Sequence, residues 1–168
     1  INDIEGQSFE DLIKQIMGTN PKVQFLGFRD TPTDTSKLTQ YAKDTMPKMK
    51  QAFFTFAEDV SVNERKKLTV ELHRKIDSFF KQYNQEDGRF ERDRVTVTSC
   101  SNKMITWKGM LNTREIPQCY HEMTNPLYKK GVTTVIYHGR MSTNSTPEWA
   151  YAHPNGADAD IGINGEYN

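Results

Sequence analysis

The chain has 168 residues with 22 basic and 22 acidic side chains, so its formal net charge is +0. This length suits one domain or part of a larger one. The balanced charge gives no reason to expect nucleic acid or an anionic membrane as a partner. No run approaches the roughly 20 apolar residues of a membrane span. Hydrophobic residues make up 35% of the chain, a low share, so burial is expected to draw on neighbouring segments.

The cysteines and histidines show no metal-binding pattern. Cys100 and Cys119 form neither a C-x-x-C pair nor a zinc-ligand spacing, and the four histidines are scattered. The cysteines are interpreted as reduced thiols, which favours a reducing compartment, either the cytoplasm or the interior of an organelle. The chain begins at Ile1 without a methionine or a signal peptide, so its start is interpreted as a cut or a processing site.

The N-terminal half shows alternating helical and strand periodicities. In chain order, the expected elements are a helix at Ser8–Met17 capped by Ser8 and ended by Gly18, a strand at Val23–Phe28, a turn at Asp30–Asp34, a short helix at Lys37–Thr45, a buried aromatic strand at Lys50–Ala57, a helix after the capping box Ser61-x-x-Glu64, and a loop at Gln82–Arg92.

The C-terminal half is richer in β signals and loops. The expected elements are a hairpin of Val95–Cys100 and Met104–Lys108, a short helix at Arg114–Tyr120, a loop opening at Asn125-Pro126, a strand at Gly131–Tyr137, a polar loop at Met141–Gly156, and a strand at Ala159–Ile163. One α+β unit is the simplest architecture for this order of elements.

Arg140 follows the strand expected at Gly131–Tyr137 and precedes Ser142, Thr143 and Asn144. A guanidinium group binds a carboxylate through two parallel hydrogen bonds, and neighbouring hydroxyls can complete the shell. Taken alone, the pattern is explained more often by a capped surface turn.

Asn164 and Gly165 form a second candidate pair. An asparagine side-chain N–H and a glycine backbone N–H can point at one oxygen and form a minimal oxyanion hole. Asn-Gly after a strand is also a common hairpin turn, which in isolation is the favoured explanation. Trp149 is expected to pack its loop rather than to bind a ligand, and His138 and His153 lie near no recognisable nucleophile motif.

Six segments gain weight when they are read together. They are Gly27–Asp34 (GFRDTPTD), Met46–Phe53 (MPKMKQAF), Cys100–Met110 (CSNKMITWKGM), Ile116–Tyr120 (IPQCY), His138–Asn144 (HGRMSTN) with Pro147, Trp149, Ala152 and Pro154, and Asn164–Asn168 (NGEYN). In this order and approximate spacing, the segments resemble the class II glutamine amidotransferases, and most closely the glutaminase domain of glutamate synthases.

The resemblance implies an α+β fold of the N-terminal-nucleophile hydrolase type, an αββα sandwich, of which residues 1–168 form an incomplete part of a single domain. It implies hydrolysis of glutamine to glutamate and ammonia, with transfer of the ammonia to 2-oxoglutarate. By this resemblance, Arg140 holds the glutamine α-carboxylate with help from Thr143, while Asn164 and Gly165 form the oxyanion hole. FMN and an iron–sulfur cluster belong to other parts of the complete enzyme, and no cofactor is expected in this chain.

The family's nucleophile is an N-terminal cysteine whose own α-amino group acts as the base. Neither Cys100 nor Cys119 can take that role, so the nucleophile is expected upstream of Ile1, and the residue that binds the substrate amino group downstream of Asn168. The expected partners are glutamine and the remainder of the amidotransferase and synthase domains, or a larger assembly. The alternative is a non-catalytic scaffold or interaction subunit that keeps the same framework.

Overall fold

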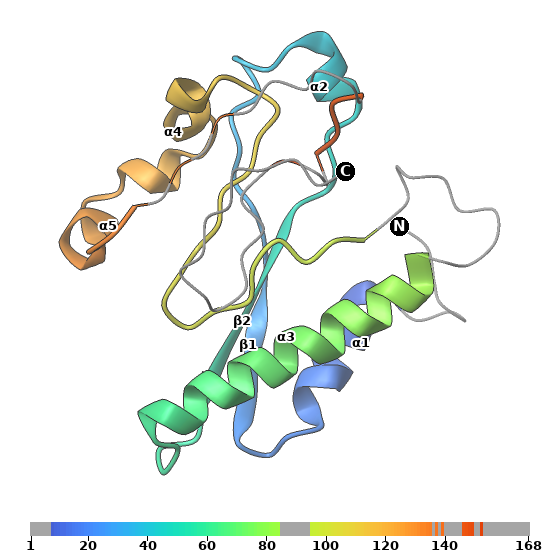
Figure 1. Ribbon diagram of the computed structural model, residues 1–168, viewed down its shortest axis with the longest axis vertical. Helices are drawn as coiled ribbons and strands as arrows, with labels where there is room; N and C mark the ends of the chain where they lie inside the picture. The colour runs from blue at the N-terminus through green and yellow to red at the C-terminus, as the bar shows by residue number, and fades with distance from the viewer. Residues whose placement is uncertain are drawn as a thin grey trace, which may run out of the picture.

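The computed structural model describes residues 8–84, 95–135, 137, 139, 146–149 and 152. The described part is α+β, with a single two-stranded sheet, one long helix and several short helices (Figure 1). In chain order the elements are α1 (Phe9–Gly18), β1 (Val23–Asp30), α2 (Gln40–Asp44), β2 (Lys50–Phe56), α3 (Val62–Asn84), the 3-10 turn η2 (Thr113–Glu115), α4 (Ile116–Cys119), the 3-10 turn η3 (His121–Thr124) and α5 (Pro126–Gly131).

β1 and β2 pair in antiparallel register, from Val23 opposite Phe56 to Asp30 opposite Lys50. The register shifts at a bulge between Phe25 and Gly27. Gly27 has φ 154° there, a conformation that side-chain-bearing residues rarely adopt, so glycine suits this position. Both strands lie where the sequence predicted them, and β1 continues two residues beyond the predicted end.

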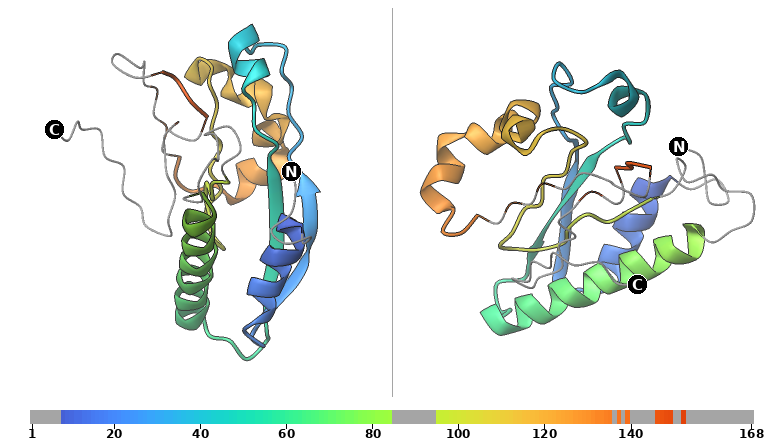
Figure 2. Two further views of the ribbon diagram at one scale, coloured as in Figure 1. Left: turned by 90° about the vertical axis from the view of Figure 1, so that its right-hand side faces the viewer. Right: turned by 45° about the horizontal axis from the view of Figure 1, so that its top comes forward.

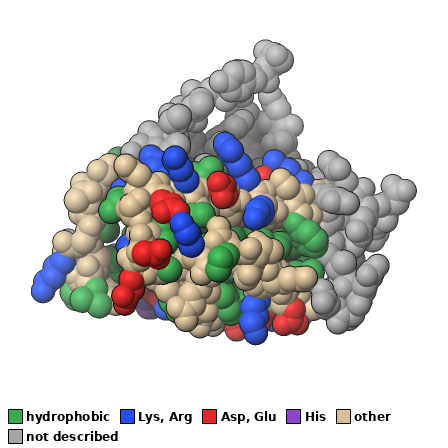
Figure 3. Space-filling model, turned by 90° about the horizontal axis from the view of Figure 1, so that it is seen from below, with side chains coloured by type: hydrophobic (Ala, Val, Ile, Leu, Met, Phe, Trp, Pro, Cys, Tyr) green, Lys and Arg blue, Asp and Glu red, His purple; other side chains and the backbone are tan. Residues whose placement is uncertain are grey.

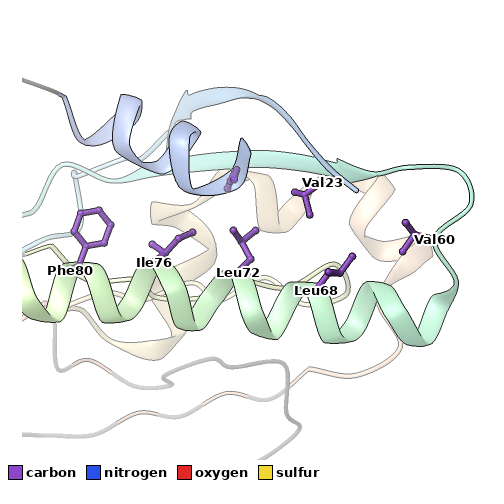
Figure 4. Close-up of a cluster of buried hydrophobic side chains, with 7 residues drawn as sticks. Val23, Val60, Leu68, Leu72, Ile76 and Phe80 are labelled. Carbon is purple, nitrogen blue, oxygen red and sulfur yellow. The ribbon is translucent and has the colours of Figure 1, made fainter. Parts of the chain in front are cut away.

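The main core lies between the sheet and two helices, α1 and α3. α3 runs along one side of the strand pair (Figure 2), and its apolar stripe points toward α1 and the strands (Figure 4). The buried members of the cluster are Met17, Val23, Val60, Leu68, Leu72, Ile76 and Phe80. The helix predicted after the capping box is therefore confirmed as α3, with spacing that places one side chain per turn in the core.

The helix ends show how capping residues set the boundaries. Ser8 accepts a hydrogen bond from the Asp11 backbone N–H at 3.2 Å and starts α1 as predicted. At α3, Ser61 accepts from the Glu64 N–H at 3.3 Å, but the Glu64 carboxylate pairs with Lys22 at 2.6 Å. Only half of the predicted capping box is therefore present, because a cation competes for the glutamate.

Three predictions about the N-terminal half need correction. The aromatic strand at β2 is not buried, since the described helices cover one face of the sheet and Phe53 on the other face is 43% exposed. α3 continues to Asn84, so the first residues of the predicted loop Gln82–Arg92 are helical. The short helix α2 begins at Gln40 rather than Lys37, because Thr39 caps it.

The predicted hairpin of Val95–Cys100 and Met104–Lys108 is absent, because the described residues there form no strand. Residues of both predicted strands instead contact other parts of the molecule. Val95 and Val97 pack against the main core, and the Lys108 carbonyl accepts a hydrogen bond from the Tyr120 hydroxyl. Only the turn remains, with Ser101 accepting hydrogen bonds from two following backbone N–H groups.

Two further predictions fail around α5. Asn125-Pro126 begins a helix instead of a loop, because Asn125 caps the Leu127 N–H at 2.9 Å and proline suits the first helical position. The strand predicted at Gly131–Tyr137 is not formed in its described residues, since Gly131 is the last residue of α5 and 132–135 have no strand partner. The short helix predicted at Arg114–Tyr120 is confirmed as η2 and α4.

The exposed surface carries mixed charge. On the face seen in Figure 3, Lys and Arg side chains alternate with Asp and Glu side chains among apolar patches. None of the described helices has the length and apolar character needed to cross a bilayer. No sandwich of two sheets is seen in the described residues.

Candidate functional site

The four predicted site residues, Arg140, Thr143, Asn164 and Gly165, lie outside the residues that the structure describes. So does Asn168 at the end of the last family-like segment. The structure does describe chain on both sides of the segment that contains Arg140 and Thr143. Those flanking contacts define where the chain enters and leaves the predicted substrate-binding segment.

On the C-terminal flank, Trp149 is anchored to α2. Its side chain is 7% exposed and belongs to a second buried cluster with Leu38 and Ala42. The indole Nε1–H donates to the Ala42 carbonyl oxygen at 3.1 Å, and the Tyr41 hydroxyl donates to the Pro147 carbonyl at 3.3 Å. Figure 1 shows this orange-red piece of chain beside α2. The prediction that Trp149 packs its loop is confirmed.

The hydrogen bond from Trp149 satisfies a backbone carbonyl at the C-terminal end of α2. Carbonyls in the last turn of a helix lack the N–H partner that a continuing helix would supply. Ala42 lies in such a turn, because α2 ends at Asp44. The indole N–H supplies a donor to that carbonyl, so the polar end of the Trp149 ring is satisfied where its apolar part is buried.

On the N-terminal flank, Gly139 lies tight against η2. A Cβ placed on Gly139 would come within 2.4 Å of the Thr113 hydroxyl oxygen, a distance that non-bonded atoms do not tolerate. η2 is itself capped by Asn112, whose side chain accepts from the Arg114 N–H at 3.0 Å. Arg140 therefore follows directly on a point of close backbone approach.

A polar group that sequence patterns did not reveal surrounds Asp34. One carboxylate oxygen accepts from the Ser36 N–H at 2.7 Å, and the other lies 3.5 Å from His121 Nε2. The Asp34 backbone N–H donates to the Cys119 carbonyl at 2.8 Å. The hydrogen bonds from Ser36 hold the pKa of Asp34 below its usual value, and His121 adds a smaller effect in the same direction.

Arg29 links the sheet to η3. Its guanidinium pairs with Glu122 at 2.6 Å, donates to the Gln51 side chain, and lies over the Phe53 ring at 5.3 Å. The Glu122 side chain is 18% exposed, so this pair is better shielded than the other surface pairs. Arg29 and Gln51 come from two of the family-like segments, and η3 follows directly on a third.

The two cysteines are both free thiols. Cys119 is fully buried, and burial, together with nearby Asp34, raises the pKa of its thiol. A nucleophilic cysteine needs the thiolate form, which this environment disfavours. Cys100 donates to the Thr69 carbonyl at 3.8 Å. Among the described residues, no group of three metal-ligating side chains is present.

Comparison with known families agrees with the six sequence segments. The model of the family described as "Glutamine amidotransferases class-II" matches residues 3–168. The chain belongs to the class-II glutamine amidotransferases.

Within that family, its similar relatives are glutamate synthases. It is 31% identical over 150 residues to a chloroplastic ferredoxin-dependent glutamate synthase of Oryza sativa subsp. japonica, covering 89% of this chain and 9% of the relative. It is 32% identical over 146 residues to the chloroplastic ferredoxin-dependent glutamate synthase 2 of Arabidopsis thaliana, covering 87% and 8%. The large chain of the NADPH glutamate synthase of Bacillus subtilis is 28% identical over 130 residues, covering 77% and 8%.

The chain thus spans less than a tenth of the length of these curated relatives. No solved structure matches it.

Proposed function

We propose that this chain is part of the glutamine-hydrolysing domain of a glutamate synthase. The observation that carries the proposal is the family match over residues 3–168 together with relatives that are glutamate synthases. The domain would hydrolyse glutamine to glutamate and ammonia, and the ammonia would be transferred to 2-oxoglutarate elsewhere in the complete protein. Glutamine is therefore the proposed substrate of the part to which this chain belongs.

The proposed fold is the αββα sandwich of N-terminal-nucleophile hydrolases, with residues 1–168 as part of one domain. The described helix–sheet pair supports it, because α1 and α3 cover one face of β1 and β2. The other face presents Leu26, 59% exposed, and Phe53. A second sheet packed on that face would bury these side chains, as stacked sheets do about 10 Å apart.

The proposed substrate contacts divide between the two ends of glutamine. The Arg140 guanidinium would donate two parallel hydrogen bonds to the α-carboxylate, and the Thr143 hydroxyl would donate a further one. At the side-chain amide, Asn164 and Gly165 would donate hydrogen bonds to the oxygen that becomes negative when the carbonyl is attacked. These donors would stabilise the tetrahedral intermediate more than the substrate, which lowers the barrier.

The nucleophile is proposed to be a cysteine outside residues 1–168. Its thiolate would attack the side-chain amide carbon, ammonia would leave, and water would then release glutamate from the thioester. The buried Cys119, with its raised thiol pKa, is unsuited to this step.

FMN and an iron–sulfur cluster are proposed to reside in other domains of the complete protein. An iron–sulfur cluster generally takes four cysteine ligands, whereas this chain has two cysteines. The residues present here therefore do not fit a cluster site. The further partners are the rest of the amidotransferase domain and the synthase domains, in the cytoplasm or an organelle interior.

The test is an assay of ammonia and glutamate release from glutamine by the complete polypeptide that contains this chain, combined with its intact mass and N-terminal sequencing. We expect a mature terminus that begins with cysteine and hydrolysis that is lost when this cysteine is changed to serine. A polypeptide that has no such cysteine and does not hydrolyse glutamine would instead be the non-catalytic scaffold.

A further inference from the structure

We propose that Trp149 is a positioning residue for glutamine binding, because it fixes the chain beside the predicted substrate-binding segment to α2. The inference rests on the proposed function for one premise, that Arg140 and Thr143 contact glutamine. Trp149 itself need not touch the substrate. It acts by fixing to α2 the stretch of chain that follows the segment.

The first ground is that the Trp149 side chain is both buried and hydrogen-bonded. The ring is buried against Leu38 and Ala42, and its N–H donates to the Ala42 carbonyl at 3.1 Å. Burial resists withdrawal of the ring, while the hydrogen bond fixes its rotation, because a donor must point at its acceptor. Trp149 therefore holds both the position and the orientation of the backbone that carries it.

The second ground is a separate bond to the same stretch of chain. Tyr41 is 47% exposed, and its hydroxyl donates to the Pro147 carbonyl at 3.3 Å. Pro147 and Trp149 are thus attached to successive residues of one short helix. Two hydrogen bonds hold α2 in place. The Thr39 side chain accepts from the Ala42 N–H at 3.2 Å. The chain before α2 is joined to the chain after it, because the Thr31 N–H donates to the Met49 carbonyl at 3.0 Å.

The third ground is the close approach on the other flank. Gly139 immediately precedes Arg140 and lies against Thr113, where a Cβ would meet the hydroxyl oxygen at 2.4 Å. The chain therefore passes close to η2 just before Arg140 and is anchored to α2 after Thr143. An anchor beside a binding segment reduces the conformational entropy that substrate binding must remove.

The test is the Trp149→Phe variant of the complete protein, which keeps an aromatic ring and removes the N–H donor. Loss of one hydrogen bond typically changes an equilibrium by about three- to tenfold. We expect KM for glutamine to rise by this factor while kcat stays within about twofold. That split identifies weakened binding with intact chemistry.

The matched control is Trp107→Phe, made at the other tryptophan of the chain. Trp107 stacks on Tyr120 with ring centroids 4.8 Å apart, and this contact lies outside the anchor on α2. We expect its KM to equal that of the unmodified protein. Equal increases in both variants would indicate a general loss of packing and would overturn the positioning role.

Tyr41→Phe gives an independent reading, because the side chain is exposed and its loss of a hydroxyl is not expected to impair folding. We expect a rise in KM of about twofold, from the weaker bond to Pro147. If Trp149→Phe yields no folded protein, the KM of Tyr41→Phe alone tests the positioning role. An unchanged KM in Tyr41→Phe would then overturn the inference.

Arg140→Ala, measured alongside, separates the two proposals. A large rise in KM for Arg140→Ala with no change for Trp149→Phe would overturn the positioning role and leave the proposed function intact. An unchanged KM for Arg140→Ala would overturn the site assignment, and the positioning role with it. Increased KM for Arg140→Ala, Trp149→Phe and Tyr41→Phe, but not for Trp107→Phe, supports both.

Discussion

The core around α1, α3 and the sheet is held together differently from the region around α2 and η2. In the core, seven buried apolar side chains form a continuous cluster, and the contacts have no required direction. Around α2, a small cluster of three buried residues is supplemented by directed bonds from Trp149 and Tyr41. The core thus sets stability, whereas the α2 region sets where particular pieces of chain lie.

The largest expected effect tests the core. Phe80 is 2% exposed and packs edge-on against Phe9 and Phe79. Phe80→Ala should lower the free energy of unfolding by about 3–5 kcal/mol, since it removes a buried ring and leaves a cavity. Denaturant unfolding of the complete protein measures this. The neighbouring Lys81→Ala is the control, because that side chain is 71% exposed. A Phe80 variant as stable as the Lys81 variant would refute the core assignment.

The next effect concerns chemistry instead of stability. Asn164→Ala should reduce kcat for glutamine hydrolysis by about 10²–10³, the usual cost of removing an oxyanion-hole donor. Unlike Phe80→Ala, it should leave the unfolding midpoint nearly unchanged. Steady-state kinetics and thermal unfolding of the same preparation give both readings. A kcat within a few-fold of the unmodified protein would remove Asn164 from the proposed site.

A third prediction tests the tight approach at Gly139. Gly139→Ala should raise KM for glutamine by about two- to threefold, because the added Cβ meets the Thr113 hydroxyl and either that side chain or the chain next to Arg140 must shift. Combining it with Thr113→Ala should restore most of the affinity, since the Thr113 Cβ is 3.6 Å from the new carbon. Failure of the second change to rescue the first would mean that this contact does not set the position of the chain.

The smallest expected effect is a pH dependence at Asp34. Its pKa in the folded protein lies below the ordinary value of 3.8, so the ionised form stabilises the fold above that value. This contribution is lost as the pH falls through the folded pKa. Asp34→Asn should therefore lower the melting temperature slightly at neutral pH and not at strongly acidic pH. An equal shift at both pH values would show that the charge is not responsible.

Sequence periodicity predicted the core better than the α2 region. The buried residues Leu68, Leu72, Ile76 and Phe80 recur once per turn of α3, and the strands β1 and β2 are β-rich, so local periodicity was sufficient to predict this helix and both strands. The β-rich segment at Val95–Cys100 led to an incorrect strand prediction, because strand propensity does not show whether a second strand is available for pairing. The dipeptide Asn125-Pro126 is compatible with both a loop and the start of a helix. In the structure the Asn125 side chain caps α5, so the helix forms.

The surroundings of the site were predictable only in part. That Trp149 packs its loop followed from its residue type, but its partner Ala42 lies 107 positions earlier in the chain. No local pattern could identify that pair. The nearness of His121 to Asp34 is likewise a tertiary contact between distant segments. The roles of Arg140, Thr143, Asn164 and Gly165 remain predictions from family resemblance, because these residues lie outside the described part.

The sequence separation between Trp149 and Ala42 also has a consequence for folding order. A contact that closes a loop of 107 residues carries a large entropic cost before it contributes any stabilisation. The neighbouring contacts along α3 are local and can form early. We therefore expect refolding to regain helix content first and the Trp149 environment last. A newly made chain would then be compact before the proposed glutamine-binding segment is anchored.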